Sequence, residues 1–138
     1  MADRYVLDTN IMSAILRKEP GVIHHVSLAL LANAEFLLCP VVFYEILRGL
    51  ERRDAKKQRT YFLRFVETFT WDDFTKLDWQ LAAQTHALAL AQGESPSDAD
   101  LLIGTFAARR DAVIITDNEK HFAPFVSLLN LPTQNWRR

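Results

Sequence analysis

The stretch that decides the fold is RYVLDTNIMSAIL, residues 4 to 16. Its first four residues form a short aromatic and β-branched run, which is typical of a buried strand, and residues 10–18 then change to the apolar spacing of a helix. Asp8 lies at the junction, with no glycine between the two patterns. A carboxylate so deep in an apolar pattern is not an ordinary surface charge, so we expect it to have a function.

The same alternation continues along the chain. Further strands are predicted at 35–39 and 112–116, with a possible last strand at 126–131 and either a short strand or a turn at 69–74. Helices are predicted at 22–34, 40–53, 54–68, 75–92 and 95–110, with a loop and short helix at 117–125. Alternating strands and helices indicate βαβ units, hence an α/β fold with a parallel sheet between helices. Residues 1–138 show no linker and are expected to form a single domain.

Composition places the chain among ordinary globular proteins. Apolar residues make up 49% and charged residues 24%, and a net charge of −1 argues against a protein that coats DNA. Cys39 is the single cysteine, so neither a disulfide nor a thiolate zinc site is expected. We recognise no signal peptide or membrane-spanning segment, and therefore expect a cytoplasmic protein.

Four acidic residues fall where the predicted fold has a common edge. Asp8 and Asp117 close predicted strands, whereas Glu45 and Asp100 lie in the first turns of predicted helices. Right-handed βαβ units bring strand ends and the following helix N-termini to one edge, so these side chains should meet. Neighbouring carboxylates repel each other unless a cation compensates them. Oxygen ligands select hard ions such as Mg²⁺ or Mn²⁺, which suit metal-assisted hydrolysis of a phosphate ester.

Four motifs in this order resemble the PIN-domain family and, among its members, the VapC toxins of bacterial toxin–antitoxin pairs. They are LDTN at 7–10, YEILRGL at 44–50, DADLLIGTFA at 98–107 and TDNEKHF at 116–122. The resemblance covers nearly the whole chain. It implies a three-layer α/β/α sandwich with a parallel sheet of about five strands, and an endoribonuclease that cuts RNA with Mg²⁺ or Mn²⁺. It also implies a VapB-like antitoxin as partner and a homodimer.

The resemblance assigns roles to five residues. Asp8 and Asp100 match the aspartates that bind the metal most directly, and Glu45 matches a glutamate that binds through water or orients the nucleophile. Asn118 matches the polar residue after the late strand, but Asp117 stands beside it, and which of the two faces the ion stays open. The hydroxyl groups of Thr9 and Thr116 are candidates for positioning a phosphate or a water. The chain departs from the family at 41–42, where two valines replace a frequent serine or threonine.

Purely structural interpretations compete with these roles. Asp8 could serve only as the N-cap of a helix that begins at Asn10. Glu45 could be a solvated salt-bridge partner of Arg48 and Arg52, at i+3 and i+7 on its helix. Residues 117 and 118 could form an ordinary Asx-type turn.

The start of the helix near residue 97 has two possible frames. In the favoured one, Ser95 is the N-cap and Asp98 completes a capping box, with Pro96 at the first helical position. In the other, Ser97 is the N-cap and Asp100 is its partner three residues later.

Some features do not decide between structure and function. Residues 48–64 hold seven Lys or Arg against two acidic residues, which suits either an RNA-backbone contact or a solvated helix face. The four histidines show no metal-ligand spacing and are interpreted as structural or surface residues. Trp136 and the arginines after it suggest a terminus that docks on the core or on a second subunit.

Two other functions remain as alternatives. A phosphatase of the haloacid-dehalogenase type also has an aspartate after its first strand, but needs a second acid two residues later, where this chain has Asn10. A non-catalytic nucleic-acid or protein-binding module would keep the fold without turnover. An acidic edge argues against it, because bare carboxylates repel phosphates.

Overall fold

The computed structural model describes residues 3–137, and its centre is a parallel sheet of five strands. The strands are β1 (Arg4–Leu7), β2 (Glu35–Leu38), β3 (Thr70–Trp71), β4 (Val113–Ile115) and β5 (Thr133–Gln134). Their order is β3-β2-β1-β4-β5, and every neighbouring pair is parallel. The first strand of the chain is therefore the central one, and the predicted parallel α/β sheet is confirmed.

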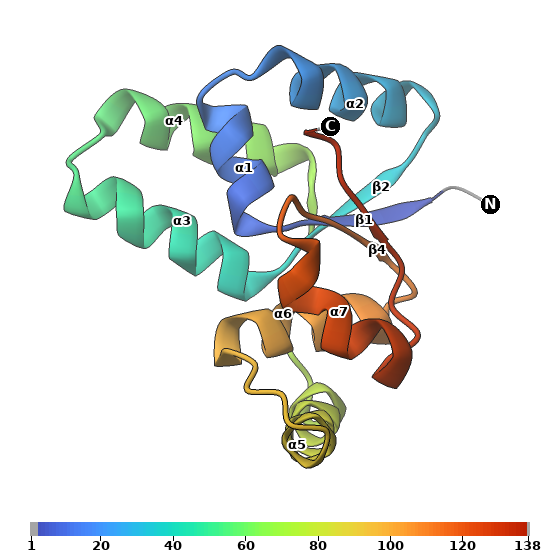
Figure 1. Cartoon of the computed structure of the whole chain (residues 1–138). Coiled ribbons are helices and arrows are strands. Elements are labelled where there is room, and N and C mark those ends of the chain that lie inside the picture. The colour runs from blue at the N-terminus through green and yellow to red at the C-terminus, as the bar shows by residue number, and fades with distance from the viewer. Residues whose placement is uncertain (1–2, 138) are drawn as a thin grey trace.

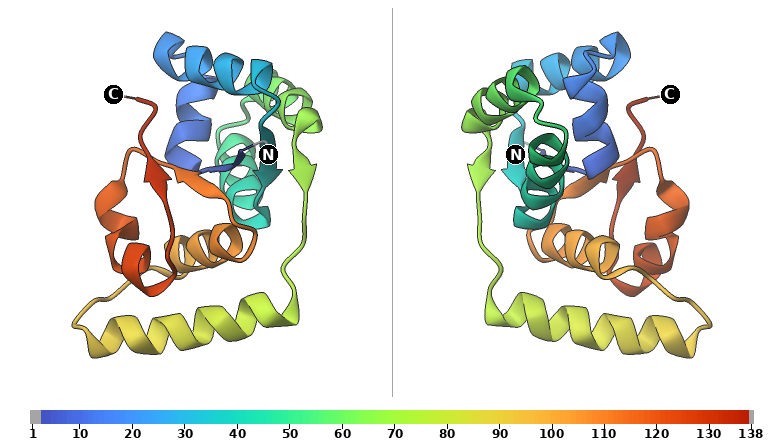
Figure 2. Two further views of the ribbon diagram at one scale, coloured as in Figure 1. Left: turned by 90° about the vertical axis from the view of Figure 1, so that its right-hand side faces the viewer. Right: turned by 90° about the vertical axis from the view of Figure 1, so that its left-hand side faces the viewer.

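Helices cover both faces of this sheet. They are α1 (Thr9–Leu16), α2 (Pro20–Leu31), α3 (Pro40–Arg52), α4 (Lys56–Phe65), α5 (Lys76–Ala91), α6 (Asp98–Arg109) and α7 (Glu119–Leu128), with a 3₁₀ turn η1 (Val66–Thr68) after α4. In Figure 1, α1, α2 and α4 lie above the sheet and α6 and α7 below it, while α3 leaves from the end where β2 stops. Figure 2 shows α5 as the outermost helix, beyond α6. The three-layer sandwich is confirmed.

None of the helices within residues 3–137 combines the length and the apolar character needed to cross a membrane.

The strand predicted at 126–131 is wrong. Most of that segment belongs to α7 and the turn after it, and the last strand is β5, which begins only after Pro132. Phe122 and Phe125, one helical turn apart, are both fully buried, so the amphipathic period of the helix extends into this run. A short apolar run does not distinguish a strand from a buried helix segment, which is why the prediction failed. At 69–74 the structure has a short strand, β3.

The favoured frame for the start of α6 is also wrong. Ser97, in extended conformation, is the N-cap, and its Oγ accepts a hydrogen bond from the backbone N–H of Asp100 at 3.1 Å. The helix therefore begins at Asp98 rather than at Pro96, and its residues Leu101 and Ile103 are buried in the core. By contrast, the predicted end of α5 is confirmed, because Gly93 follows that helix in the left-handed region at φ 81°.

A buried ion-pair cluster fastens α5 to α6. Asp78, whose side chain is 0% exposed, accepts hydrogen bonds from Arg109 Nε at 2.8 Å and Arg110 Nη2 at 2.8 Å. It also completes a capping box with Thr75 at the start of α5. Burial by itself would raise the pKa of Asp78, but the hydrogen bonds from Arg110, Thr75 and Arg109 outweigh it and lower the pKa to about 2.

We predict that Asp78→Asn destabilises the fold by about 3–5 kcal/mol, because it leaves two guanidinium groups without their buried counter-charge. The matched control is Asp72→Asn, which removes the half-exposed partner of Arg110 at 2.7 Å and should cost no more than about 1 kcal/mol. Urea unfolding at neutral pH measures both values.

The pH dependence should follow the lowered pKa. The stabilisation by ionised Asp78 is complete above its unfolded pKa of 3.8 and is lost as the pH falls toward 2. The difference between wild type and Asp78→Asn should therefore shrink between pH 4 and pH 2. Equal stability of Asp78→Asn and Asp72→Asn at neutral pH would contradict this account.

Candidate active site

The site is built around Asp8, at the carboxyl end of the central strand β1. Its side chain is 5% exposed, and it is the N-cap of α1, accepting a hydrogen bond at Oδ1 from the backbone N–H of Thr9 at 2.8 Å. The capping interpretation is therefore confirmed in part, although the helix begins at Thr9 and not at Asn10. Capping uses one carboxylate oxygen, and the second oxygen is directed elsewhere.

That second oxygen joins the ends of β1 and β4. Asp8 Oδ2 accepts a hydrogen bond at 2.9 Å from the hydroxyl of Thr116, which is fully buried and lies 108 residues further along the chain. The backbone N–H of Asp8 donates to the carbonyl of Ile115 at 2.9 Å. The Thr116 hydroxyl in turn accepts from the backbone N–H of Asn118 at 2.9 Å. The turn after β4 is thereby oriented by the side chain that ends β1.

Glu45 reaches this centre from the second turn of α3. Its Oε1 accepts a hydrogen bond at 2.7 Å from the hydroxyl of Thr9, the residue that follows Asp8. The salt-bridge interpretation of Glu45 is wrong, because within residues 3–137 the Glu45 carboxylate forms no ion pair. The guanidinium of Arg48 lies instead 5.1 Å from the centre of the Tyr44 ring. The negative charge of Glu45 therefore faces the site without a basic partner there.

Asp100 approaches from the first turn of α6. Its Oδ2 lies 3.4 Å from His121 Nδ1, at the start of α7. The pKa of Asp8 is raised to about 6, because burial and the charges of Asp100 and Glu45 outweigh the lowering effect of its hydrogen bonds from Thr116 and Thr9. Asp8, which ends β1, is therefore near enough to Glu45 on α3 and Asp100 on α6 for their charges to act on it.

Asp117 and Asn118 differ in their surroundings. The carboxylate of Asp117 pairs with the guanidinium of Arg137, which also binds Glu19 Oε1 at 3.0 Å through Nε. Asn118 is the N-cap of α7, and its side chain makes no capping hydrogen bond. The local turn is held by the Thr116 hydroxyl rather than by an Asx side chain. Asp117 thus has its charge compensated by the C-terminal segment, and Asn118 keeps its amide available.

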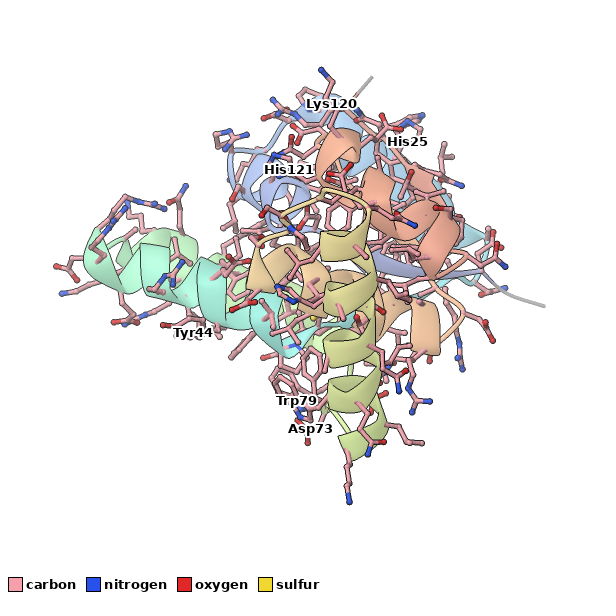
Figure 3. All side chains as sticks on the ribbon, turned by 60° about the horizontal axis from the view of Figure 1, so that its bottom comes forward. His25, Tyr44, Asp73, Trp79, Lys120 and His121 are labelled. Carbon is pink, nitrogen blue, oxygen red and sulfur yellow. The ribbon has the colours of Figure 1, made fainter. Side chains whose placement is uncertain are left out.

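Sequence reasoning missed two neighbours of the site. His121 was expected to be structural or a surface residue, yet it contacts Asp100, and Figure 3 shows it with Lys120 near the start of α7. Its position three residues after Asn118, one helical turn into α7, could have indicated this. Arg137 carried no usable signal, because its pairing with Asp117 depends on how the C-terminal segment folds back over the sheet.

The donor chemistry of the site suits a hard cation. Within residues 3–137, no three His, Cys, Asp or Glu side chains come together closely enough to enclose a metal ion. Asp8 and Glu45 form no ion pair in the same part of the chain, so their charges are left for another group to balance. Oxygen donors of this kind suit Mg²⁺, which is usually bound by one or two carboxylates and several waters.

Comparisons with known proteins agree with this geometry. The chain is 29% identical over 125 residues to a protein named Ribonuclease VapC19 from Mycobacterium tuberculosis, covering 89% of this chain and 95% of that protein. It resembles the structure of VapBC2 from Rickettsia felis bound to a promoter DNA fragment, with a TM-score of 0.83, 25% identity, and 96% and 98% of the two chains covered. It also resembles VapBC-1 from nontypeable Haemophilus influenzae, with a TM-score of 0.83, 22% identity, and 98% and 99% covered.

A family model agrees with these individual similarities. The model that describes the PIN domain matches residues 5–124, which include Asp8, Glu45, Asp100, Asp117 and Asn118. This match spans most of the chain, from β1 through β4 to the first part of α7. The chain therefore belongs to the PIN domain family.

Proposed function

We propose that the chain is a metal-dependent endoribonuclease and the toxin of a VapBC-like toxin–antitoxin pair. The observation that carries the proposal is the buried Asp8 carboxylate, held by Thr116 and Thr9 and surrounded by the charges of Glu45 and Asp100. Its relative from M. tuberculosis is named a ribonuclease. Residues 1–138 would form one nuclease domain that works in the cytoplasm.

Asp8 and Asp100 would hold Mg²⁺, or Mn²⁺ in its place, and the bound ion supplies a Lewis acid for the phosphoryl oxygen and lowers the pKa of water. Thr116 fixes one oxygen of Asp8, so that its carboxylate cannot rotate away. Glu45, oriented by the Thr9 hydroxyl, binds or orients the attacking water. Asn118 adds a neutral amide to the acidic edge of the sheet, whereas Asp117 contributes a carboxylate whose charge Arg137 offsets.

The two alternative functions have no observation in their favour. The position that a phosphatase would need for its general acid is Asn10, and its side-chain oxygen lies 3.5 Å from the backbone N–H of Asp117. A pure binding module would not need a buried carboxylate at the end of the central strand, without a basic partner within residues 3–137. Membership of the PIN domain family also favours a nuclease over both.

The solved relatives point to the protein partner. The structures from R. felis and H. influenzae are both of VapBC. We propose that a VapB-like antitoxin binds this chain over the acidic edge of the sheet. A basic side chain from that partner would balance the charge of Asp8 and Glu45 and exclude the metal ion.

A second copy of the chain is the other proposed partner. Tyr44 on α3 and Trp79 on α5 are 59% and 52% exposed, and Figure 3 shows both on one side of the molecule. They line a mainly apolar hollow of about 460 Å³ together with Phe74 and Leu102. Large exposed apolar side chains around a hollow mark protein interfaces, so we propose that the homodimer forms here.

We predict that Asp8→Asn lowers the rate of RNA cleavage by more than about 100-fold, because it removes the charge of the principal metal ligand. The assay uses bacterial total RNA with purified, antitoxin-free chain in Mg²⁺, and EDTA should abolish cleavage by the wild type. Asp111→Asn is the matched control, since Asp111 is an exposed carboxylate in a left-handed turn that asparagine tolerates. Undiminished cleavage by Asp8→Asn would end the assignment.

A second prediction concerns stability without metal. The pKa of Asp8 is raised from 3.8 to about 6, so its protonated form is favoured in the folded state. The stabilisation of the folded state by protonated Asp8 is complete below pH 3.8 and is lost as the pH rises through 6. In EDTA, the unfolding temperature of the wild type should therefore fall as the pH rises from 4 to 7.5, whereas that of Asp8→Asn, which has no charge to develop at this position, should fall less.

Added Mg²⁺ should raise the unfolding temperature of the wild type and leave that of Asp8→Asn unchanged. Differential scanning fluorimetry across the pH range measures both effects, with Asp111→Asn expected to behave as the wild type. An equal response of wild type and Asp8→Asn to Mg²⁺ would show that the ion does not bind at Asp8.

The dimer is tested by light scattering after size-exclusion chromatography. We predict that Trp79→Glu gives a monomer, because it places a charge in the apolar hollow, while Leu31→Glu on α2 stays dimeric although Leu31 is 80% exposed. Circular dichroism confirms that both variants are folded. A dimer that survives Trp79→Glu would place the interface elsewhere.

A further inference from the structure

A second hollow lies beside the carboxylates, between α1, α3 and α4. Figure 1 shows these three helices together on the side of the molecule where β1 ends. The hollow has a volume of about 370 Å³, within the range of about 300–1,000 Å³ that ligand pockets occupy. Thr9 and Glu45 line it, so it opens directly onto the proposed reaction centre.

Three polar side chains that line this hollow have no partner within residues 3–137. Ser13 on α1, Arg53 at the end of α3 and Gln58 on α4 form no side-chain hydrogen bond or ion pair in that part of the chain. A fourth, Arg17, is already bound to Glu19 at 2.8 Å. The side chains of Ser13, Arg53 and Gln58, which come from three helices, are therefore available to bind a polar ligand in this hollow.

Gly49 keeps this space open. It lies on the wall formed by α3, and a Cβ atom there would come within 3.5 Å of Arg53 Nη1. Any longer side chain at this position would extend into the hollow beneath the guanidinium. The absence of a side chain thus allows a ligand to reach Arg53 and Glu45 at the same time.

Arg53 offers an anionic ligand a positive charge that no carboxylate balances within residues 3–137, on the hollow that Glu45 also lines. Arg53 is one of the seven basic residues of segment 48–64, whose role the sequence left open. Two others have partners, because Arg59 pairs with Glu51 at 2.6 Å and Arg48 stacks on Tyr44. Arg53 instead lines the hollow together with Arg17, and an arginine fork suits phosphate oxygens.

We propose that this hollow binds the RNA nucleotide next to the scissile phosphate. Arg53 contacts a backbone phosphate, while Ser13 and Gln58 hydrogen-bond to the sugar or the base, as is typical of single-stranded RNA recognition. The single basic side chain proposed above for the antitoxin would meet Glu45 at one wall of the hollow, whereas a basic segment that filled the hollow would place its cations against Arg17 and Arg53. This inference rests on the proposed ribonuclease function and specifies how its substrate is held.

The test measures RNA binding apart from cleavage. Fluorescence anisotropy of a labelled mixed-sequence single-stranded RNA is recorded in EDTA, over a series of salt concentrations. We expect Arg53→Ala to raise Kd by about 10-fold and to reduce the slope of log K against log salt by about 0.7, the value for one phosphate contact. The matched control is Arg52→Ala, which removes an equal charge one residue earlier, at a residue that does not line the hollow. It should change Kd less than about 2-fold, because a single exposed charge contributes little.

Gly49→Leu provides a second variant that fills the hollow and leaves every charge in place. It should weaken RNA binding and raise the KM for cleavage, with kcat reduced less. Equal binding by Arg53→Ala and Arg52→Ala, with wild-type binding by Gly49→Leu, overturns the subsite. Unchanged RNA binding with weaker inhibition by the antitoxin would assign the hollow to the protein partner and also overturns it.

Failure of the subsite is distinguishable from failure of the proposed function. If the wild type cleaves RNA in Mg²⁺ and Asp8→Asn does not, but Arg53→Ala matches Arg52→Ala, only the subsite is refuted. If the wild type cleaves no RNA in Mg²⁺, the ribonuclease function is refuted and the subsite with it.

Discussion

The pairing of β1 with β4 is the constraint on which the rest of the structure depends. It places Asp8 beside Thr116, and the hydrogen bond from that buried hydroxyl holds one carboxylate oxygen in place. Because parallel strands need a crossover between them, the chain passes through six helices and two further strands between β1 and β4 before it forms this neighbourhood. Glu45 comes from α3, which follows β2 on the other side of β1, and Asp100 comes from α6, which leads into β4, so both strands beside β1 contribute to the acidic edge.

Two buried aspartates show how the same residue type meets opposite electrostatic surroundings. Asp78 is surrounded by Arg109, Arg110 and the capping N–H of α5, and its pKa is lowered to about 2. Asp8 accepts only neutral hydrogen bonds and faces other carboxylates, and its pKa is raised to about 6. The first arrangement is complete within the protein and stabilises it. The second is electrostatically incomplete, which is the property that a site for a cation requires.

The basic residues around the site are divided in a similar way. Arg137, in the C-terminal segment after β5, pairs with Asp117 and Glu19. These ion pairs connect that segment to the turn after β4 and to the loop after α1, and they neutralise the charge of Asp117. Arg53 has no such pairing in the described part of the chain and lines the hollow beside Glu45. The near-neutral total charge of the chain therefore conceals local charges that a substrate would meet.

The sequence by itself determined the alternation of strands and helices up to β4 and the parallel sheet, and it predicted one edge for the carboxylates, because apolar periodicity is local and crossovers have one hand. Only the tertiary structure decided the rest. The pairing of the last strand with β4 and the contacts of His121 and Arg137 depend on partners in other parts of the chain, whereas the choice of Ser97 as N-cap depends on which frame of α6 packs in the core. Such contacts arise from packing, in which each residue's position is settled by neighbours that no local pattern specifies.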